Sequence, residues 1–369
     1  MIILAIESSC DDSAVCIIKY TVNNDISINQ NKITLNDIKR DEYQILSHYM
    51  YSQIKDHQIF KGVMPELASF LHTNKLKHLI QISLQKANID INEIDCVAAT
   101  AGPGLIGSLM VGTTYAKTLA SILNKPYIAI NHLEAHALSP MINSNLQAPY
   151  LLLLVSGGHS QFIIVEKIGK YKLLGKTYDD AVGECFDKVA RLLGLEYPGG
   201  PAIEKAAING NCKKFTFPIA APEKLEHGCN MSFSGIKTFA LNLTKKMTKE
   251  ELDLNINNIA ASFQDGIAQN LCYKANIAMD MYKKEIQIQK DQLNFVIAGG
   301  VASNEYIRNK LSELALNRGF NIFQPEKELC TDNAIMVAFT AAQYFKHNIT
   351  HTLNFAPRSK WPLQELNEL

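Results

Sequence analysis

The sequence predicts an α/β protein with two lobes, and three observations support this fold class. The chain has 369 residues, which is more than the roughly 250 to 300 residues that one hydrophobic core usually serves. Between residues 95 and 130, a buried strand, a glycine-rich turn, a small-residue helix and a second strand follow one another, which is the order of an α/β unit. A strand–turn–strand pattern near residue 10 returns near residue 157, so both halves begin in the same way.

The composition is that of a cytosolic globular protein. Hydrophobic residues make up 47% of the chain and charged residues 20%, and the formal net charge is +0. A neutral chain offers no broad basic surface, so a nucleic-acid substrate would need a partner to help hold it. The eight cysteines include no Cys-x-x-Cys pair and lie among apolar residues, as reduced thiols do. The longest strongly apolar run, residues 150–155, is far too short to cross a bilayer, so we expect a cytoplasmic protein without a membrane segment.

The first lobe is expected to begin with a β-hairpin. Residues 2–6 and 14–18 are apolar runs rich in β-branched side chains, and the turn between them carries hydroxyls and carboxylates. In this turn, Asp11 and Asp12 suit a position that faces water, a metal ion or an amine. Residues 23–42 are polar without clear periodicity, which indicates an insertion that forms a mobile loop or an extended hairpin.

The other elements follow from apolar periodicity and from the positions of glycine and proline. The first half adds strands at 44–52, 95–100 and 127–130 and helices at 65–87 and 105–123. The second half adds strands at 151–155, 161–165 and 294–297, helices at 179–193 and 258–284, a helical stretch from about 236, a helix that ends near 317, and a last helix for which Thr331 or Asp332 is the expected N-cap.

These elements suggest how the chain divides. We expect residues 1–130 to form the first lobe, residues 131–330 the second, and residues 331–369 a C-terminal helix and tail that pack back toward the first lobe. The small residues of the 105–123 helix suit either a surface for a partner or close internal packing.

The types and spacing of the polar residues in the stretch Asn-His-Leu-Glu-Ala-His at 131–136 indicate a chemical role beyond packing. In a helix, His132 and His136 lie one turn apart on one face, where both imidazoles can reach one metal ion. The zinc-protease motif H-E-x-x-H has its glutamate directly after the first histidine, but Leu133 holds that position and Glu134 lies about 200° around the helix from His132. The sequence therefore favours a metal site without protease chemistry, with a chance pair of histidines as the alternative. Asp332 is the natural third ligand, unless it serves only as a helix cap.

Two further stretches suit a nucleotide. The turn at 156–158 can offer backbone N–H groups and a hydroxyl to a phosphate without a Walker lysine, although an ordinary hairpin turn has the same pattern. Gly299 and Gly300 follow a buried strand, and Asn304 begins the next helix, which leaves room for a flat adenine against the backbone. A tight connection between strand and helix explains this glycine pair about as well.

One helical face carries Asp180, Glu184 and Asp187 and could be read as a metal or acid–base cluster. Lys188 and Arg191, however, stand four residues after Glu184 and Asp187, and such spacing forms ion pairs on a helix surface. A solvated face is therefore the preferred interpretation for most of these carboxylates.

Taken together, the motifs resemble one protein family. In chain order they are Ile6-Glu7-Ser8-Ser9-Cys10-Asp11-Asp12, Ala101-Gly102-Pro103-Gly104-Leu105, His132-Leu133-Glu134-Ala135-His136, Leu154-Val155-Ser156-Gly157-Gly158-His159, Phe186-Asp187-Lys188, Tyr197-Pro198-Gly199-Gly200-Pro201, Ser232-Phe233-Ser234-Gly235-Ile236-Lys237, Ala298-Gly299-Gly300-Val301 and Cys330-Thr331-Asp332-Asn333. This order closely resembles the TsaD group of the Kae/Gcp/YgjD family over nearly the whole chain, apart from residues 23–42 and the tail after about residue 345.

The resemblance implies a fold and a reaction. The fold would be the actin/hexokinase/Hsp70-like (ASKHA) fold, with two ribonuclease H-like lobes and the ligand in the cleft between them. The reaction would move a threonylcarbamoyl group from threonylcarbamoyl-AMP to the exocyclic amine of the adenosine next to the anticodon, in tRNAs that read codons beginning with adenine. A TsaB-like paralogue and a TsaE-like ATPase would be partners, and a TsaC-like synthase would supply the adenylate.

The resemblance also implies roles for individual residues. His132, His136 and Asp332 would hold one divalent metal per subunit, usually taken as Fe²⁺, with Zn²⁺ as the alternative. Asp11 would lie where a proton leaves the amine, as a general base. The adenylate substrate, or ATP, would be bound by Leu154, Val155, Ser156, Gly157, Gly158, Asp187, Gly200, Glu204 and Asn304.

Three positions depart from the family pattern. Asp12 stands where most relatives have glutamate, Glu204 stands where many have aspartate, and Phe60-Lys61-Gly62 replaces a turn richer in glycine. The alternatives to the transferase are an ATPase or small-molecule kinase of the same fold, and a non-catalytic scaffold, which would be expected to lack the two histidines and Asp332. A metalloprotease is disfavoured by Leu133.

Overall fold

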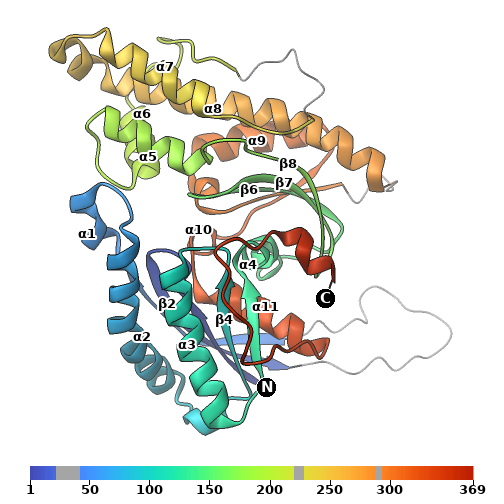
Figure 1. The fold of residues 1–369 in the computed structure, drawn as a ribbon. Helices are drawn as coiled ribbons and strands as arrows, with labels where there is room; N and C mark the ends of the chain where they lie inside the picture. Colours follow the sequence, from blue (N-terminus) through green and yellow to red (C-terminus); the bar gives the residue numbers. More distant parts are fainter. Residues whose placement is uncertain (22–41, 220–227, 287–292, 369) are drawn as a thin grey trace. The chain divides into compact units, whose positions relative to one another are not determined.

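The computed structural model describes residues 1–21, 42–219, 228–286 and 293–368 (Figure 1). These residues form two compact units, each with one five-stranded sheet. The first unit comprises Met1–Gln53, Met64–Ala135 and Asn333–Trp361, and the second comprises Ile54–Val63, His136–Asp332 and Pro362–Leu369. The insertion expected at 23–42 lies almost wholly outside the described residues. No helix in the described ranges is both long enough and apolar enough to cross a membrane.

The first sheet has the strand order β3-β2-β1-β4-β5. β1 and β2 form the predicted antiparallel hairpin, and β3 pairs antiparallel with β2. β4 and β5 run parallel to β1, so the carboxyl ends of β1, β4 and β5 lie at one edge of the sheet. The strands are β1 (Ile2–Glu7), β2 (Asp12–Thr21), β3 (Glu42–Ser52), β4 (Cys96–Gly102) and β5 (Tyr127–Asn131).

The second sheet repeats this topology. Its order is β10-β9-β6-β7-β8, with antiparallel pairs β6–β7 and β7–β8 and parallel pairs β6–β9 and β9–β10. Each strand therefore has a counterpart in the first sheet, and the repeat predicted from the strand–turn–strand pattern is confirmed. The strands are β6 (Tyr150–Val155), β7 (Ser160–Lys167), β8 (Lys170–Lys176), β9 (Asn294–Ala298) and β10 (Asn321–Phe323).

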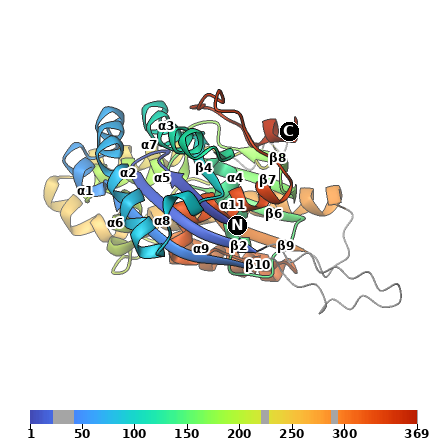
Figure 2. The same ribbon diagram turned by 90° about the horizontal axis from the view of Figure 1, so that it is seen from below.

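Helices cover the strands of each unit. In the first unit α2 and α3 pack on each other and on the sheet, and α11 packs along β1 and β2. In the second unit α8 packs on α6, α7 and α9, and α9 lies beside β10 (Figure 2). The helices are α1 (Ile54–His57), α2 (Pro65–Ala87), α3 (Ile106–Leu123), α4 (His132–Leu138), α5 (Val182–Leu192), α6 (Gly199–Ala207), α7 (Ser234–Lys245), α8 (Lys249–Ile286), α9 (Glu305–Asn317), α10 (Lys327–Cys330) and α11 (Ala334–Lys346), with short 3₁₀ turns at Gln58–Phe60, Ile91–Glu93, Ser139–Met141, Gly300–Ser303 and Leu363–Glu368.

Two helices begin at other residues than the sequence predicted. The helix expected at 179–193 begins only at Val182, because the backbone of Ala181 is extended. Before it, the Asp179 side chain accepts the backbone N–H of Phe233 at 2.8 Å. α8 begins at Lys249, earlier than the expected residue 258. The core of the second unit joins these helices, since the ring centroids of Phe186 on α5 and Phe263 on α8 are 5.0 Å apart in an edge-to-face contact.

The N-cap of α11 is a correction to the sequence analysis. Neither Thr331 nor Asp332 caps this helix, because the side chain of Asn333 accepts the backbone N–H of Met336 at 2.9 Å. The N-cap is the residue directly before the first helical residue. Because α11 begins at Ala334, this position belongs to Asn333 and not to Asp332. The carboxylate of Asp332 is therefore left for another role.

Removing this cap is expected to cost about 1 kcal/mol of unfolding free energy. Asn333→Ala loses the acceptor for the Met336 N–H, whereas Asn333→Ser keeps an oxygen at a favourable N-cap residue. Urea unfolding of both variants measures the difference. Equal stability losses in the alanine and serine variants would show that the hydrogen bond contributes nothing.

The last part of the first unit is a strap, residues 351–361, that runs along the sheet. His351 bridges to Tyr127 on β5, Arg358 donates its N–H to the Ala101 carbonyl at 2.8 Å, and the Trp361 carbonyl accepts from Asn131. A Cβ at Gly102 would lie 2.1 Å from the Arg358 oxygen, so the strap needs glycine at the end of β4. The part of the tail from residue 346 to Trp361, which the family motifs did not cover, is thus an integral part of this unit, whereas Pro362–Leu369 belong to the second.

Candidate active site

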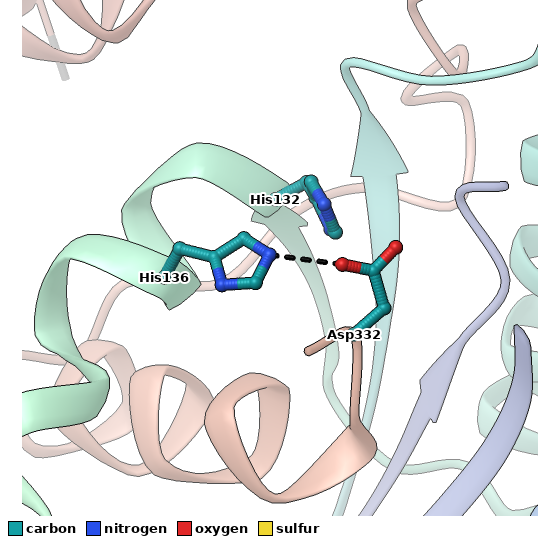
Figure 3. Close-up of side chains that lie close together, drawn as sticks. All are labelled: His132, His136 and Asp332. Atoms are coloured by element: carbon teal, nitrogen blue, oxygen red, sulfur yellow. Dashed lines mark hydrogen bonds and ion pairs between the residues drawn. The ribbon is translucent and has the colours of Figure 1, made fainter. Parts of the chain in front are cut away.

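Two histidines and one aspartate converge at one point of the structure. His132 and His136 lie one turn apart on α4, and Asp332 lies two residues after the end of α10 (Figure 3). Their ligand atoms all lie within 4.8 Å of one another, and His136 Nε2 is 3.0 Å from Asp332 Oδ1. Both histidines are buried, whereas 24% of the Asp332 side chain is exposed. The structure thus brings together the three residues predicted as metal ligands.

The start of α4 is held by the residue before it. Asn131, the last residue of β5, accepts the backbone N–H groups of Leu133 at 2.9 Å and Glu134 at 3.3 Å through its Oδ1 atom. Its Nδ2 group donates to the Trp361 carbonyl at 2.9 Å. Asn131 therefore caps the short helix and anchors it to the strap, which sets the position of His132 at the first turn.

Glu134 makes a different contact from the two histidines. It is fully buried and accepts a hydrogen bond from the hydroxyl of Tyr344 on α11. Burial, reinforced by the neighbouring carboxylate, raises the pKa of Tyr344, so this hydroxyl stays protonated and donates. Glu134 is thus engaged in the packing of α4 on α11, in keeping with the argument against protease chemistry.

The donor set fits a divalent transition metal. Two imidazoles and one carboxylate form the set used by non-haem iron sites and by several catalytic zinc sites. The 3.0 Å between His136 Nε2 and Asp332 Oδ1 matches two neighbouring ligands that are each about 2.1 Å from a shared ion. His132 Nδ1 lies 3.2 Å from the Glu7 carboxylate, which is the usual outer partner of a metal-binding histidine.

Asp11 lies in the turn between β1 and β2. Its backbone carbonyl accepts the Gln53 N–H at 3.0 Å. The Cys10 carbonyl beside it lies 3.0 Å from Nε2 of the buried His72 and accepts from the Ser108 hydroxyl at 3.3 Å. The turn is therefore well held. Within the described residues, however, the cluster of possible metal ligands comprises His132, His136 and Asp332, without Asp11.

The turn after β6 offers backbone groups in place of side chains. Leu154 and Val155 are fully buried on the strand and pair with Gln161 and Ser160 of β7. The Ser156 N–H donates to the His159 carbonyl at 2.8 Å, and the Ser156 hydroxyl accepts the His159 N–H at 3.2 Å. The next two residues, Gly157 and Gly158, are exposed, and open space surrounds the position of a Cβ at each.

Two other glycines allow close approach to this turn. Gly299 has φ of +93° and ψ of 165°, and a Cβ there would lie 2.4 Å from the Val155 carbonyl oxygen. A Cβ at Gly183 would lie 2.7 Å from Gly157 Cα, and the Gly183 N–H donates to the Ser156 carbonyl. The atoms that approach Gly299 thus belong to β6, as expected for the tight strand–helix connection that was the alternative interpretation, and the adenine contact stays a prediction.

Asp187 and Gly200 meet at the start of α6. The Asp187 carboxylate accepts the Gly199 N–H at 2.7 Å, and Gly200 follows in the first turn with open space at its Cβ position. On the same face of α5, Glu184 and Lys188 form the expected ion pair at 2.7 Å. A small hollow lies beside Asp187, and its lining residues are Lys61, Asp187, Arg191, Leu195, Glu196, Tyr197 and Gly199.

Asn304 and Glu204 both serve the first turn of α9. Asn304 accepts the Ile307 N–H at 3.0 Å as its N-cap and donates to Gln264 at 2.8 Å. Glu204 accepts the Glu305 N–H at 2.7 Å, so it joins α6 to α9. The structure places the residues predicted to bind the adenylate in one unit, around the ends of β6 and β9 and the N-termini of α6 and α9.

Sequence reasoning missed several residues that pack around the three predicted metal ligands and α4. Glu7 was noted only as part of a polar turn, and Thr100 and Tyr344 were not considered for the site. One signal was present for Glu7, since a carboxylate directly after a buried apolar strand is costly unless it has a partner. Nothing in the sequence indicates that this partner is His132, which is 125 residues away.

Comparison with known proteins identifies the family and the fold. The family model TsaD, tRNA N6-adenosine threonylcarbamoyltransferase, matches residues 44–339. Curated proteins of that name are 45% identical over 365 residues in Rickettsia massiliae (strain Mtu5), covering 99% of both chains, and 44% identical over 369 residues in Bartonella tribocorum (strain CIP 105476 / IBS 506), covering 99% of this chain and 96% of the relative.

Among solved structures, HypF from T. kodakarensis superposes with a TM-score of 0.60 at 14% identity, covering 95% of this chain and 49% of HypF. Full-length HypF in its phosphate- and nucleotide-bound form gives 0.57 at 15% identity, with 94% and 46% covered. This chain spans about half of each HypF chain, and at such low identity the likeness shows the fold alone. The repeated sheets and this likeness confirm the predicted two-lobed α/β fold of the ASKHA type. The matched family model and the two curated relatives cover most of the chain, and the chain therefore belongs to the TsaD family of tRNA N6-adenosine threonylcarbamoyltransferases.

Proposed function

We propose that this protein transfers a threonylcarbamoyl group from threonylcarbamoyl-AMP to the exocyclic amine of the adenosine next to the anticodon, in tRNAs that read codons beginning with adenine. Membership of the family supports the reaction. The observation that carries it at the level of residues is the convergence of His132, His136 and Asp332 within 4.8 Å. A scaffold that had lost its activity would have no reason to keep this donor set.

The proposed metal site is one divalent ion per subunit, Fe²⁺ in preference to Zn²⁺, held by His132, His136 and Asp332. The ion, when bound, supplies a Lewis acid that polarises the carbonyl of the threonylcarbamoyl group. The chain's own contribution is to present three ligand atoms from rigid positions. α4 is capped by Asn131, and Asp332 stands next to the capped start of α11.

For the adenylate we propose the backbone of residues 154–158 together with Asp187, Gly200, Glu204 and Asn304. The exposed Gly157 and Gly158 leave their N–H groups open to a phosphate, and the α6 N-terminus beside Gly200 adds donors of the same kind. Such donors stabilise negative charge that builds up as the bond to AMP breaks. Glu204 and Asn304 would act by fixing the first turn of α9, since their side-chain oxygens accept from it.

Asp11 is our candidate for the general base that takes a proton from the adenosine amine. Its turn is held by contacts of the Cys10 carbonyl and of its own carbonyl, which fix the backbone that carries this side chain. A TsaB-like paralogue and a TsaE-like ATPase are the proposed partners, with a TsaC-like synthase as the source of the adenylate and the cytoplasm as the location. The formal net charge of +0 supports a need for partners in holding tRNA.

The proposed reaction is tested by transfer of a labelled threonylcarbamoyl group from its adenylate to tRNA, with purified protein and partners. We expect label on tRNA that carries adenosine at the target position. We expect none on tRNA in which unsubstituted purine replaces this adenine, because unsubstituted purine lacks the exocyclic amine. Label on both tRNAs would contradict the proposed acceptor. Absence of label on either, beside an active relative as control, would favour the ATPase or scaffold alternatives, and ATP turnover would then separate these two.

A further inference from the structure

Three parallel strand ends of the first unit meet beside His132. β1 ends at Glu7, Thr100 lies near the end of β4, and His132 follows directly on β5. These strands are neighbours in the order β1-β4-β5 and all run parallel, so the three residues lie at the same edge of the sheet. Their proximity is thus a consequence of the strand order.

The Glu7 carboxylate is the centre of the contacts at this edge. Its Oε1 atom accepts the Ser9 backbone N–H at 2.5 Å, and its Oε2 atom accepts the Thr100 hydroxyl at 2.5 Å. Oε2 also lies 3.2 Å from His132 Nδ1, and the Ser9 hydroxyl lies 3.2 Å from the same nitrogen. Glu7 is fully buried, and a buried carboxylate is tolerated only where donors such as these surround it.

These contacts determine which nitrogen of His132 carries the hydrogen. A carboxylate only accepts hydrogen bonds, so the imidazole nitrogen that faces it must be the donor. With the hydrogen on Nδ1, the lone pair lies on Nε2 and is available to a metal. We propose that Glu7 is a positioning residue for the metal centre: it holds His132 in this tautomer and orientation and thereby strengthens metal binding. This inference rests on the proposed metal site, because His132 is one of its ligands.

Glu7 also links the metal ligand to the turn that carries Asp11. The carboxylate holds His132 through one oxygen and the Ser9 backbone through the other, and Ser9 lies two residues before Asp11. The Ser9 carbonyl in turn accepts the Leu105 N–H at 2.8 Å at the start of α3. A change at Glu7 is therefore expected to affect both the metal ligand and this turn, while leaving His136 and Asp332 in place.

The experiment compares Glu7→Gln with Glu134→Gln in the full-length protein. The two glutamates are matched, because both are fully buried in the first unit and both accept from a hydroxyl, Thr100 for Glu7 and Tyr344 for Glu134. The affinity for Zn²⁺ and Co²⁺ is measured by competition with a chromophoric chelator. We expect Glu7→Gln to weaken binding about 10- to 100-fold, as loss of an outer partner does, and Glu134→Gln to bind as the wild type does.

A second measurement needs no substitution at Glu7. In the wild-type protein loaded with Zn²⁺, nitrogen NMR of the histidine side chains, assigned with His132→Gln, shows which His132 nitrogen keeps its hydrogen. We expect a slowly exchanging hydrogen on Nδ1. Zinc bound through Nδ1 would overturn the proposal even if Glu7→Gln failed to fold.

The possible results separate this inference from the proposed metal site. If the wild-type protein binds neither Zn²⁺ nor Co²⁺, both the proposed metal site and the proposed role of Glu7 are contradicted. A wild type that binds metal, with Glu7→Gln equally tight, would remove only the role of Glu7. Equal losses in both glutamine variants would also remove it, since they would indicate a general effect of altering a buried carboxylate.

Discussion

His136→Ala is expected to abolish stable metal binding and, with it, threonylcarbamoyl transfer. The substitution removes one of three protein ligands and leaves His132 and Asp332, a pair too small to hold a divalent ion firmly. Because loss of an outer partner alone costs about 10- to 100-fold in affinity, loss of a ligand is expected to cost more than about 100-fold. Metal content after dialysis, chelator competition and the tRNA transfer assay measure the effect.

A matched control separates the loss of a ligand from the loss of a histidine. His48 lies on β3, outside the ligand cluster, and burial lowers its pKa, which favours the neutral imidazole. His48→Ala should keep the metal and the activity. Since His136 is almost fully buried, added imidazole that enters the space left by His136→Ala should restore part of the metal binding. A His136→Ala protein with its full metal content would contradict the proposed ligand set.

Individual strands and hairpins could be predicted from periodicity, whereas the order of the strands within each sheet could not. The hairpins at the start of each half were predicted because continuous apolar runs on both sides of a polar turn leave a clear pattern, as residues 2–18 and 151–165 show. β8 and β10 were not predicted. β8 carries three lysines in seven residues and β10 has only three residues, and such edge strands have a weak hydrophobic pattern.

The residues of the candidate site could be predicted where their short spacing in the sequence was enough to place them together. His132 and His136 are four residues apart, so helix geometry alone puts them on one face. Asp332 was ambiguous, because an aspartate before a helix can be either a metal ligand or an N-cap. Only the structure, in which α11 begins at Ala334, assigns the cap to Asn333. Glu7 could not be assigned a partner at all, because its contact with His132 depends on the order β1-β4-β5 and not on any nearby residue.

Gly299→Ala is the second change with a large expected effect. The Gly299 backbone, with φ of +93° and ψ of 165°, lies in a region that is essentially restricted to glycine. Alanine would add strain and would place its Cβ 2.4 Å from the Val155 carbonyl oxygen, a contact that requires the strand end to move. We expect a loss of about 3 kcal/mol in unfolding free energy, at the upper end for such strained positions, measured by thermal and urea unfolding.

The same change tests the nucleotide assignment. Val155 leads directly into the turn at 156–158, so displacement of its carbonyl should shift the backbone N–H groups proposed to hold the phosphate. Affinity for an adenylate analogue, measured by calorimetry on folded protein, is expected to fall more than about tenfold, which corresponds to about 1.4 kcal/mol.

The neighbouring glycine supplies the control. Gly300 has no atom within 4 Å of its Cβ position, so Gly300→Ala should change stability by no more than about 0.5 kcal/mol. If Gly299→Ala lost stability but bound the analogue as tightly as the wild type, close packing of η6 (Gly300–Ser303) on β6 would be a structural requirement alone. The adenylate would then have to be placed elsewhere than on the backbone at 154–158.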